Sequence, residues 1–148
     1  RHTFTLAGED KVYTRGTGRL QLDFRGFTFC PLICYDLRFP VWSRNTDGYD
    51  VLLYVANWPT PRVAAWDTLL RARAIENMSY VLGVNRIGSD PNRLTYSGHT
   101  AAYDSLGNRL GFAEGEEILR VSLNQSHLRE TRESLRFLQD QDRFSLEL

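Results

Sequence analysis

The sequence lacks the features that mark several protein classes. Its 148 residues contain no apolar run near the roughly 20 residues that a membrane span needs, and the formal net charge is zero. A neutral chain has no overall field that attracts nucleic acid or an anionic membrane, so neither is an expected partner. Three histidines and two cysteines without the spacing of metal ligands predict no metal, and no cofactor is expected.

Cysteine is rare, and the two residues present predict free thiols. Cys30 and Cys34 are four residues apart, which on one strand would separate them by about 13 Å. A disulfide requires Cα atoms within about 7 Å, so we expect no bridge between them. Unbridged cysteines favour a reducing compartment, and a cytoplasmic location is therefore the expectation.

Apolar segments alternate with segments of helical periodicity along most of the chain. Strands are predicted over residues 20–24 (half-buried), 27–33, 50–56 and 80–85 (buried), and 96–103, 109–113 and 117–122. Residues 62–78 predict a helix because apolar side chains recur every three or four positions, at Val63, Trp66, Leu70, Ala74 and Met78. We also expect a short helix over 39–44, a turn-rich loop over 88–92, and a final helix capped by Asn124 with a seam of Leu128, Leu135 and Leu138.

This order of elements predicts the α/β class. Buried strands separated by helices imply βαβ units with a parallel core, and the later, shorter strands are expected to be antiparallel, so the sheet is mixed. Only one long helix precedes the last one, which leaves the sheet short of the cover that buried strands need on both faces. Residues 1–148 therefore indicate one partial domain, in which residues 124–148 form a helix and a tail that could lie at a subunit interface.

One cysteine stands where the pattern predicts a catalytic edge. A buried strand ends at Cys34 and a short helix is expected to follow, so the thiol lies at the carboxyl edge of the sheet, where open α/β sheets bind ligands. The backbone N–H of Tyr35 would point the same way and could hold an oxyanion. A free thiol has a pKa of about 8.5, so a base or a cation is needed to activate it. The alternative is that Cys34 is a small buried hydrophobe, as is expected of Cys30.

Several motifs resemble one enzyme family. The segment Ile-Cys-Tyr-Asp-Leu-Arg-Phe-Pro at residues 33–40 is similar to the nucleophile motif of the nitrilase superfamily of carbon–nitrogen hydrolases. Further matches follow the family's order, at Gly8-Glu9 with Gly16, at 57–59, at 66–77, and at 97–100 followed by 104–107. Thr100 and Ser105 stand where the family usually has Ser and Pro.

The resemblance implies an αββα sandwich, of which this chain would form half, and an active site of Glu, Lys and Cys supported by a second Glu. Cys34 would attack an amide or nitrile carbon and form a thioester acyl-enzyme, which water then hydrolyses. The first Glu would act as general base, while the Lys ammonium and the N–H of Tyr35 stabilise the oxyanion. Glu9 matches the supporting carboxylate; from the residues alone, a solvated loop residue is the favoured interpretation, because Asp10 and Lys11 follow it. This chemistry requires neither a metal nor a cofactor.

The sequence departs from the family pattern in its missing lysine. The family Lys lies just before a segment that residues 2–4 resemble, so it would precede Arg1, and the first Glu would lie further upstream. Lys11 is the only lysine and follows Glu9, which is the wrong place to substitute. We therefore expect the chain alone to be inactive and to need the N-terminal half of the same protein as a partner. The family also leads us to expect a homodimer.

Arg38 is a candidate for binding a substrate carboxylate. It lies four residues beyond Cys34, and one helical turn could bring its guanidinium back over the site. In relatives that act on ω-amides of 2-oxo acids, an Arg at this place is associated with the substrate carboxylate. The alternative is an ion pair with Asp36 or Asp50 that holds the corner.

The loop after the second buried strand provides further candidate contacts. Asn57, Trp58 and Thr60 are predicted to border the substrate because the family places this loop beside the site. His99 could instead form a Cys–His pair with Cys34 in an unrelated cysteine hydrolase. That arrangement is disfavoured because the family uses no histidine base.

The favoured function is hydrolysis of a small linear amide, with the ω-amide of a 2-oxo dicarboxylate as one candidate. The short interval from Glu9 to Cys34 and the tail at 140–144 resemble the bacterial omega-amidase branch. A true nitrilase or an N-carbamoyl hydrolase is the alternative within the fold. A second alternative is a non-catalytic structural or regulatory subunit, which the missing Lys and first Glu favour for the chain as it stands.

Overall fold

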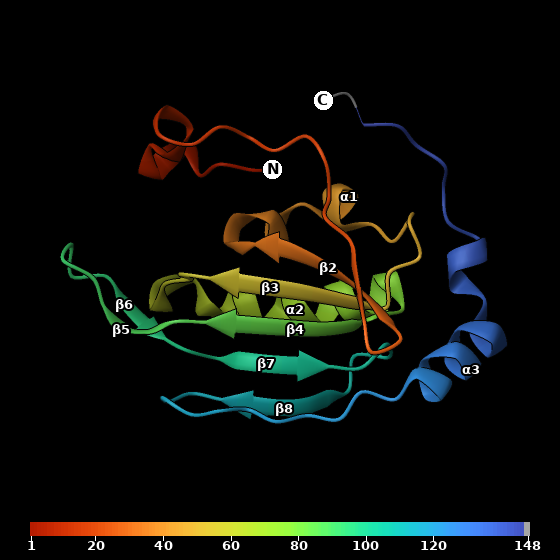
Figure 1. Ribbon diagram of the computed structural model, residues 1–148. Coiled ribbons are helices and arrows are strands. Elements are labelled where there is room, and N and C mark those ends of the chain that lie inside the picture. Colours follow the sequence, from red (N-terminus) through yellow and green to blue (C-terminus); the bar gives the residue numbers. More distant parts are fainter. Residues whose placement is uncertain (147–148) are drawn as a thin grey trace.

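A six-stranded mixed sheet forms the centre of the protein. The computed structural model describes residues 1–146, and its strands lie in the order β1-β2-β3-β4-β7-β8 (Figure 1). The parallel core comprises β2 (Phe27–Ile33), β3 (Val51–Ala56) and β4 (Tyr80–Asn85). The flanking strands β1 (Leu22–Phe24), β7 (Thr100–Tyr103) and β8 (Arg109–Ala113) pair antiparallel. The predicted α/β class with a mixed sheet is confirmed.

The helices and a small hairpin complete the fold. The α-helices are α1 (Pro40–Ser43), α2 (Val63–Asn77) and α3 (Gln125–Leu135). Short 3-10 helices lie at η1 (Thr5–Ala7), η2 (Glu9–Lys11), η3 (Cys34–Arg38), η4 (Thr60–Arg62) and η5 (Phe137–Gln139). Strands β5 (Ile87–Ser89) and β6 (Thr95–Ser97) form a separate antiparallel hairpin. Within residues 1–146 no helix has the length and apolar character to cross a membrane.

Helix α2 covers one face of the sheet with the apolar stripe that its sequence predicts. Trp66, Leu70 and Ala74 are fully buried in the main core cluster, which they share with residues of the central strands. The helix approaches the sheet closely at Gly83, where a Cβ atom would lie 2.4 Å from Cδ1 of Leu70. Only glycine allows this approach, so α2 is held tightly over the strands that carry the site.

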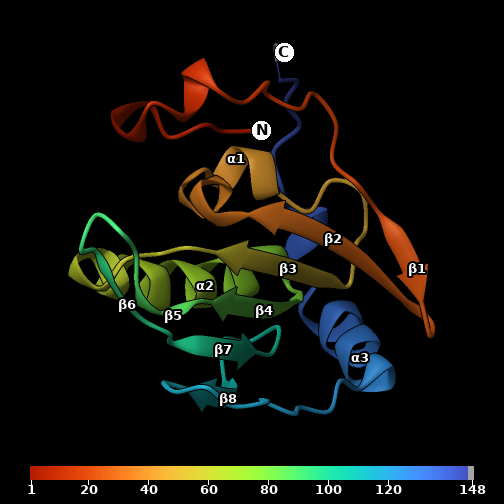
Figure 2. The ribbon, with the colours of Figure 1, turned by 60° about the vertical axis from the view of Figure 1, so that its left-hand side comes forward.

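The opposite face of the sheet is covered at one end only. Helix α3 lies near the starting ends of the parallel strands (Figure 2), where Leu128 packs in a smaller cluster with Val51 and Tyr80. At the carboxyl ends, the register aligns Ile33, Val55 and Val84 across three strands, and these side chains are 67%, 48% and 48% exposed. The sheet is therefore open on an apolar surface beside the strand ends.

Three predictions for individual strands were wrong. The strand expected over 20–24 begins at Leu22 and is exposed throughout, because β1 is an edge strand with little packed against it. The strand 27–33 has its predicted bounds, but its two faces differ in burial, and Ile33 is largely exposed. Residues 117–122 form no strand, since Leu119 and Val121 pack over Gly111 of β8 instead of pairing with a neighbour.

The region 87–103 also differs from its prediction. The loop expected over 88–92 contains the end of β5, which pairs with β6. The single strand expected over 96–103 divides into β6 and β7, because Gly98 and His99 both have positive φ angles (72° and 59°) and turn the chain. The small hairpin is thereby directed away from the main sheet.

The C-terminal helix begins as its sequence predicts. The Asn124 side chain accepts a hydrogen bond from the backbone N–H of His127 at 3.0 Å, which is an N-cap. Leu128 is buried, but Leu135 is exposed and Leu138 lies in η5 after α3 has ended, so the predicted seam of three leucines was wrong. The predicted helix and tail at 124–148 include residues 147–148, which lie outside the described residues.

Candidate active site

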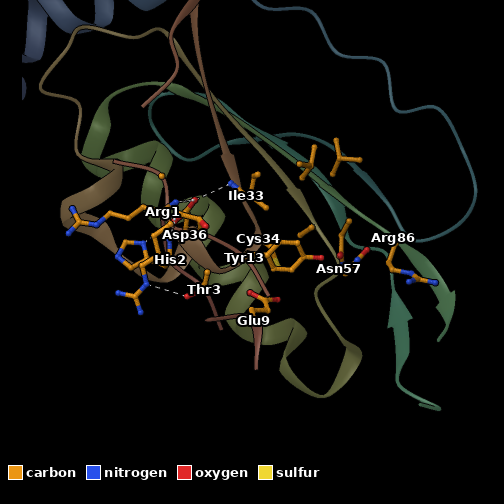
Figure 3. Close-up of a pocket in the computed structure, with 17 residues that line it drawn as sticks. Arg1, His2, Thr3, Glu9, Tyr13, Ile33, Cys34, Asp36, Asn57 and Arg86 are labelled. Carbon is orange, nitrogen blue, oxygen red and sulfur yellow. Dashed lines mark hydrogen bonds and ion pairs between the residues drawn. The ribbon is translucent and has the colours of Figure 1, made fainter. Parts of the chain in front are cut away.

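A pocket of about 860 Å³ lies at the carboxyl ends of β2, β3 and β4. Its walls come from the strand ends and from the N-terminal segment, between Arg1 and Gly16. In the view of Figure 3, Cys34 lies in the middle of the pocket, with Glu9 and Asn57 near it. These three residues come from different elements, and parallel strands bring two of them to one edge of the sheet. Cys34, Glu9 and Asn57, which the sequence singled out, thus line one pocket at this edge of the sheet.

Cys34 occupies a strained corner between β2 and η3. Its φ angle is +42°, which a side chain other than glycine rarely adopts and which costs on the order of 1–3 kcal/mol. The Asp36 carboxylate accepts the N–H of Ile33 at 3.3 Å, which closes the corner from one side. From the other side, the buried Arg73 donates through Nη2 to the carbonyl of Leu37 at 2.7 Å. The corner is therefore held by contacts outside the strand.

The electrostatic surroundings of Cys34 favour the neutral thiol. Burial is the largest effect and raises the pKa of Cys34 above its ordinary value. The backbone N–H of Asn57, and to a smaller degree that of Tyr35, hydrogen-bonds the sulfur and lowers the pKa, while the carboxylates of Glu9 and Asp36 raise it. The net shift is upward. Among residues 1–146, no cation is among the main groups that act on this pKa, and a cation is what would stabilise the thiolate.

Glu9 has a defined place in the pocket wall. It begins η2, its side chain is partly buried, and its Oε2 accepts the backbone N–H of Phe4 at 2.8 Å. Its charge acts on the thiol of Cys34, as the shift in the pKa of Cys34 shows. These contacts distinguish Glu9 from a solvated loop residue. Lys11 at the end of the same turn is exposed and does not line the pocket.

The other predicted substrate contacts are distributed around the pocket. Asn57 lines it, whereas Arg38, Trp58 and Thr60 do not belong to the pocket wall. Trp58 is 3% exposed and lies behind the wall. The guanidinium of Arg38 lies 4.7 Å from the centroid of the Trp58 ring, so the two side chains form a cation–π pair. Thr60 begins η4, and Tyr35 is the second residue of η3.

The ion pairs proposed as an alternative for Arg38 are absent from the described residues. Asp36 is engaged by His2, whose backbone N–H and Nδ1 both lie 2.9 Å from Oδ1. Asp50 forms an ion pair with Arg132 at 2.9 Å. Arg38 therefore owes its position to stacking on Trp58 rather than to either carboxylate.

Comparison with known proteins identifies the family. The carbon–nitrogen hydrolase family model matches residues 6–133, which is most of the chain. The chain belongs to the carbon–nitrogen hydrolase family. It is 47% identical to the omega-amidase YafV of Escherichia coli K12, over 99% of this chain and 58% of that protein. It is 37% identical to the 2-oxoglutaramate amidase of Bacillus subtilis, over 94% of this chain and 54% of that protein.

A solved structure supports the same membership. XC1258 of Xanthomonas campestris, described as a CN-hydrolase superfamily protein with an arsenic adduct in the active site, superposes with a TM-score of 0.95. The two are 41% identical, and the match covers 99% of this chain and 59% of that one. This carbon–nitrogen hydrolase chain thus spans less than two thirds of the length of these relatives.

The structure also places the remaining candidates for chemistry in this carbon–nitrogen hydrolase. His99 is hydrogen-bonded through Nδ1 to the Asp67 carboxylate at 2.9 Å, and it does not line the pocket around Cys34. The structure therefore does not support a catalytic pair between Cys34 and His99. Cys30 is fully buried, which confirms that it belongs to the core, and both Cys30 and Cys34 are free thiols. Among residues 1–146, no group of three His, Cys, Asp or Glu side chains is placed to hold a metal.

Sequence reasoning missed Asn85. Its buried side chain accepts the N–H of Trp58 at 2.7 Å through Oδ1 and donates through Nδ2 to the carbonyls of Trp58 and Gly98, at 2.9 and 2.8 Å. One amide therefore joins the loop after β3 to the turn before β7. A signal was available, because Asn85 is a polar residue at the end of an otherwise apolar strand.

Proposed function

We propose that this chain carries the nucleophile of an amidase that acts on small linear amides. The thiolate of Cys34 attacks the amide carbon, the tetrahedral intermediate expels ammonia, and water hydrolyses the resulting thioester to the acid. One observation carries the proposal: the Cys34 sulfur opens into a pocket from a strained corner, beside the carboxylate of Glu9 and under two backbone N–H groups.

The backbone around Cys34 suits the role of an oxyanion site. The N–H groups of Tyr35 and Asn57 both act on the sulfur and lower its pKa, which supports a place for an oxyanion beside them. We assign the Tyr35 N–H to the oxyanion, as the family resemblance implies. Glu9 takes the role of the supporting carboxylate, which orients the neighbouring charged groups.

The general base and the lysine of the family would come from residues outside these 148. Two observations support this part of the proposal. The pKa of Cys34 is raised, mainly by burial, whereas a neighbouring ammonium would lower it. Lys11, the chain's one lysine, is exposed at the surface away from the pocket wall. This chain would then correspond to the C-terminal half of its relatives and would be inactive alone.

The substrate we favour is the ω-amide of a 2-oxo dicarboxylate. Support comes from the relatives, an omega-amidase in E. coli and a 2-oxoglutaramate amidase in B. subtilis. Asn57 lines the pocket, which supports a direct contact with such a substrate. A substrate contact stays a prediction for Arg38, Trp58 and Thr60. It requires the substrate to enter along the Arg38–Trp58 pair.

The exposed apolar row supports an assembled protein. Ile33, Val55 and Val84 together present a surface on which the second sheet of an αββα sandwich would pack. We further propose a cytoplasmic homodimer in which the tail after α3 contacts the neighbouring subunit. The non-catalytic alternative, a structural or regulatory subunit, is favoured by the same raised pKa of Cys34.

The decisive experiment is release of ammonia from the ω-amide of a 2-oxo dicarboxylate. This chain is assayed alone and joined to the part of the E. coli relative that lies outside the match. We expect turnover only from the joined protein, loss of turnover in Cys34→Ala, and a thioester adduct on Cys34 by mass spectrometry. Cys30→Ala is the matched control, since Cys30 is sealed in the core. Turnover by Cys34→Ala would refute the role of the thiol, and binding without turnover in the joined protein would favour the non-catalytic subunit.

A further inference from the structure

Arg86 lies at the far end of the pocket from His2 (Figure 3). It directly follows β4, and its backbone N–H donates to the carbonyl of Ala56 at 3.1 Å, beside the loop that carries Asn57. In the view of Figure 3, Arg86 and His2 lie at opposite ends of the pocket, with Cys34 and Asn57 between them. Two strand spacings, about 10 Å, separate the strand ends that carry Cys34 and Arg86.

The guanidinium of Arg86 is held in place without being neutralised. It lies 4.5 Å from the centroid of the Tyr96 ring, and Nη2 donates to the carbonyl of Ser89 at 3.3 Å. Among residues 1–146, no ion pair joins Arg86 to a carboxylate, and its Nε and Nη1 make no hydrogen bond. The side chain is exposed and Arg86 lines the pocket, so these donors are accessible at the edge of the pocket.

The nearest acidic side chain, Asp90, is already hydrogen-bonded within the turn of the β5–β6 hairpin. Asp90 feels the charge of Arg86, but its carboxylate accepts the backbone N–H groups of Asn92 and Leu94 and the hydroxyl of Tyr96, at 2.9–3.0 Å. Tyr96 of the same hairpin also interacts electrostatically with Cys34. The pKa of Tyr96 is raised by desolvation and by Asp90, and Cys34 adds to the rise when its thiol is ionised. Charges on Cys34 and on the β5–β6 hairpin therefore lie close enough to affect each other.

We propose that Arg86 binds the distal carboxylate of the substrate and makes the site selective for amides that carry an acidic group at their far end. The amide carbon lies at Cys34, the substrate chain runs past Asn57, and the carboxylate accepts two hydrogen bonds from the planar guanidinium. Tyr96 keeps that plane in place, which reduces the entropy lost on binding. The inference rests on the proposed function and specifies its substrate class. It assigns to Arg86 the role that the sequence suggested for Arg38.

The first test compares kcat/KM for an acidic ω-amide and a neutral amide of the same length, in the protein joined to the part that completes it. Arg86→Gln should lower kcat/KM for the acidic amide by about ten- to hundredfold, mainly through KM, and leave the neutral amide within a factor of about two. Arg86→Lys should recover part of the loss. Arg15→Gln is the matched control, because Arg15 also lines the pocket and the substitution removes the same charge.

Two outcomes of this assay overturn the inference. Equal losses in Arg86→Gln and Arg15→Gln would show a general field effect rather than binding. Selective loss in Arg38→Gln, with Arg86→Gln unaffected, would assign the carboxylate to Arg38.

The second test needs no turnover. Iodoacetate and iodoacetamide alkylate the same thiol, but only iodoacetate carries a carboxylate, so the ratio of their rates at Cys34 cancels any change in the pKa of the thiol. The ratio, read by peptide mass spectrometry, should fall in Arg86→Gln and hold in Arg15→Gln. If no amide is hydrolysed but the ratio falls, the proposed function fails and the anion site stands. If amides are hydrolysed but neither selectivity nor ratio changes, the Arg86 inference fails alone.

Discussion

The strained backbone at Cys34 leads to a prediction about stability. A residue with a Cβ atom pays roughly 1–2 kcal/mol for the left-handed conformation, whereas glycine adopts it freely. Cys34→Ala and Cys34→Gly both remove the thiol, but only glycine relieves the φ angle of +42°. The difference between the two variants therefore isolates the backbone strain from the chemistry of the side chain.

The expected magnitude follows from two opposing effects. Relief of strain stabilises Cys34→Gly by about 1–2 kcal/mol, and the greater freedom of glycine in the unfolded chain costs about 0.5–1 kcal/mol. Cys34→Gly should therefore be more stable than Cys34→Ala by about 1 kcal/mol. For a protein of this size the corresponding rise in Tm is about 2–4 °C.

Urea denaturation and thermal unfolding of the two variants provide the measurement. Ala64→Gly is the control, because Ala64 is exposed in the first turn of α2 with ordinary helical geometry, and glycine there should destabilise by about 0.5–1 kcal/mol. If Cys34→Gly is less stable than Cys34→Ala by the amount that Ala64→Gly loses, the corner stores no strain. The account of how the nucleophile is presented would then be wrong.

Three further predictions concern the core, the loop and the thiol. Leu70→Ala should lower the free energy of unfolding by about 2–5 kcal/mol in urea denaturation, since Leu70 is fully buried against the sheet. A smaller loss would show that the surrounding core relaxes to fill the cavity at position 70. Asn85→Ala should cost about 1–3 kcal/mol and increase hydrogen exchange at the N–H of Trp58, which it leaves without a partner; unchanged exchange would contradict the role of Asn85. The rate of Cys34 alkylation should rise with pH, with its midpoint above the ordinary thiol pKa, because burial raises the pKa and only the thiolate reacts. Cys30, whose burial raises its pKa to about 11, should stay unmodified, and a Cys34 midpoint below 8 would contradict the missing cation.

The elements that the sequence predicted well depend on local patterns. The spacing of Trp66, Leu70 and Ala74 describes one face of a helix wherever that helix lies, and α2 has that face buried. The apolar runs that became β2, β3 and β4 were placed to within one residue for the same reason. The N-cap at Asn124 is equally local, because the side chain bonds a backbone group three residues away.

Strand pairing was harder to predict because it depends on distant partners. Residues 117–122 have the composition of a strand, but Leu119 and Val121 pack across the flat surface that Gly111 leaves on β8. The exposure of Ile33 likewise depends on what covers the sheet, since nothing in the strand itself tells whether a second layer lies over it.

The candidate site divides in the same way. The sequence by itself determined the nucleophile candidate Cys34 and the carboxylate Glu9, because a strand end and a local motif identify them. Only the tertiary structure decided that Arg38 stacks on Trp58 and that Arg86 lines the pocket. The physical reason is that the parallel register of β2, β3 and β4 brings three strand ends to one edge, across about 50 residues of chain that no short-range pattern can span.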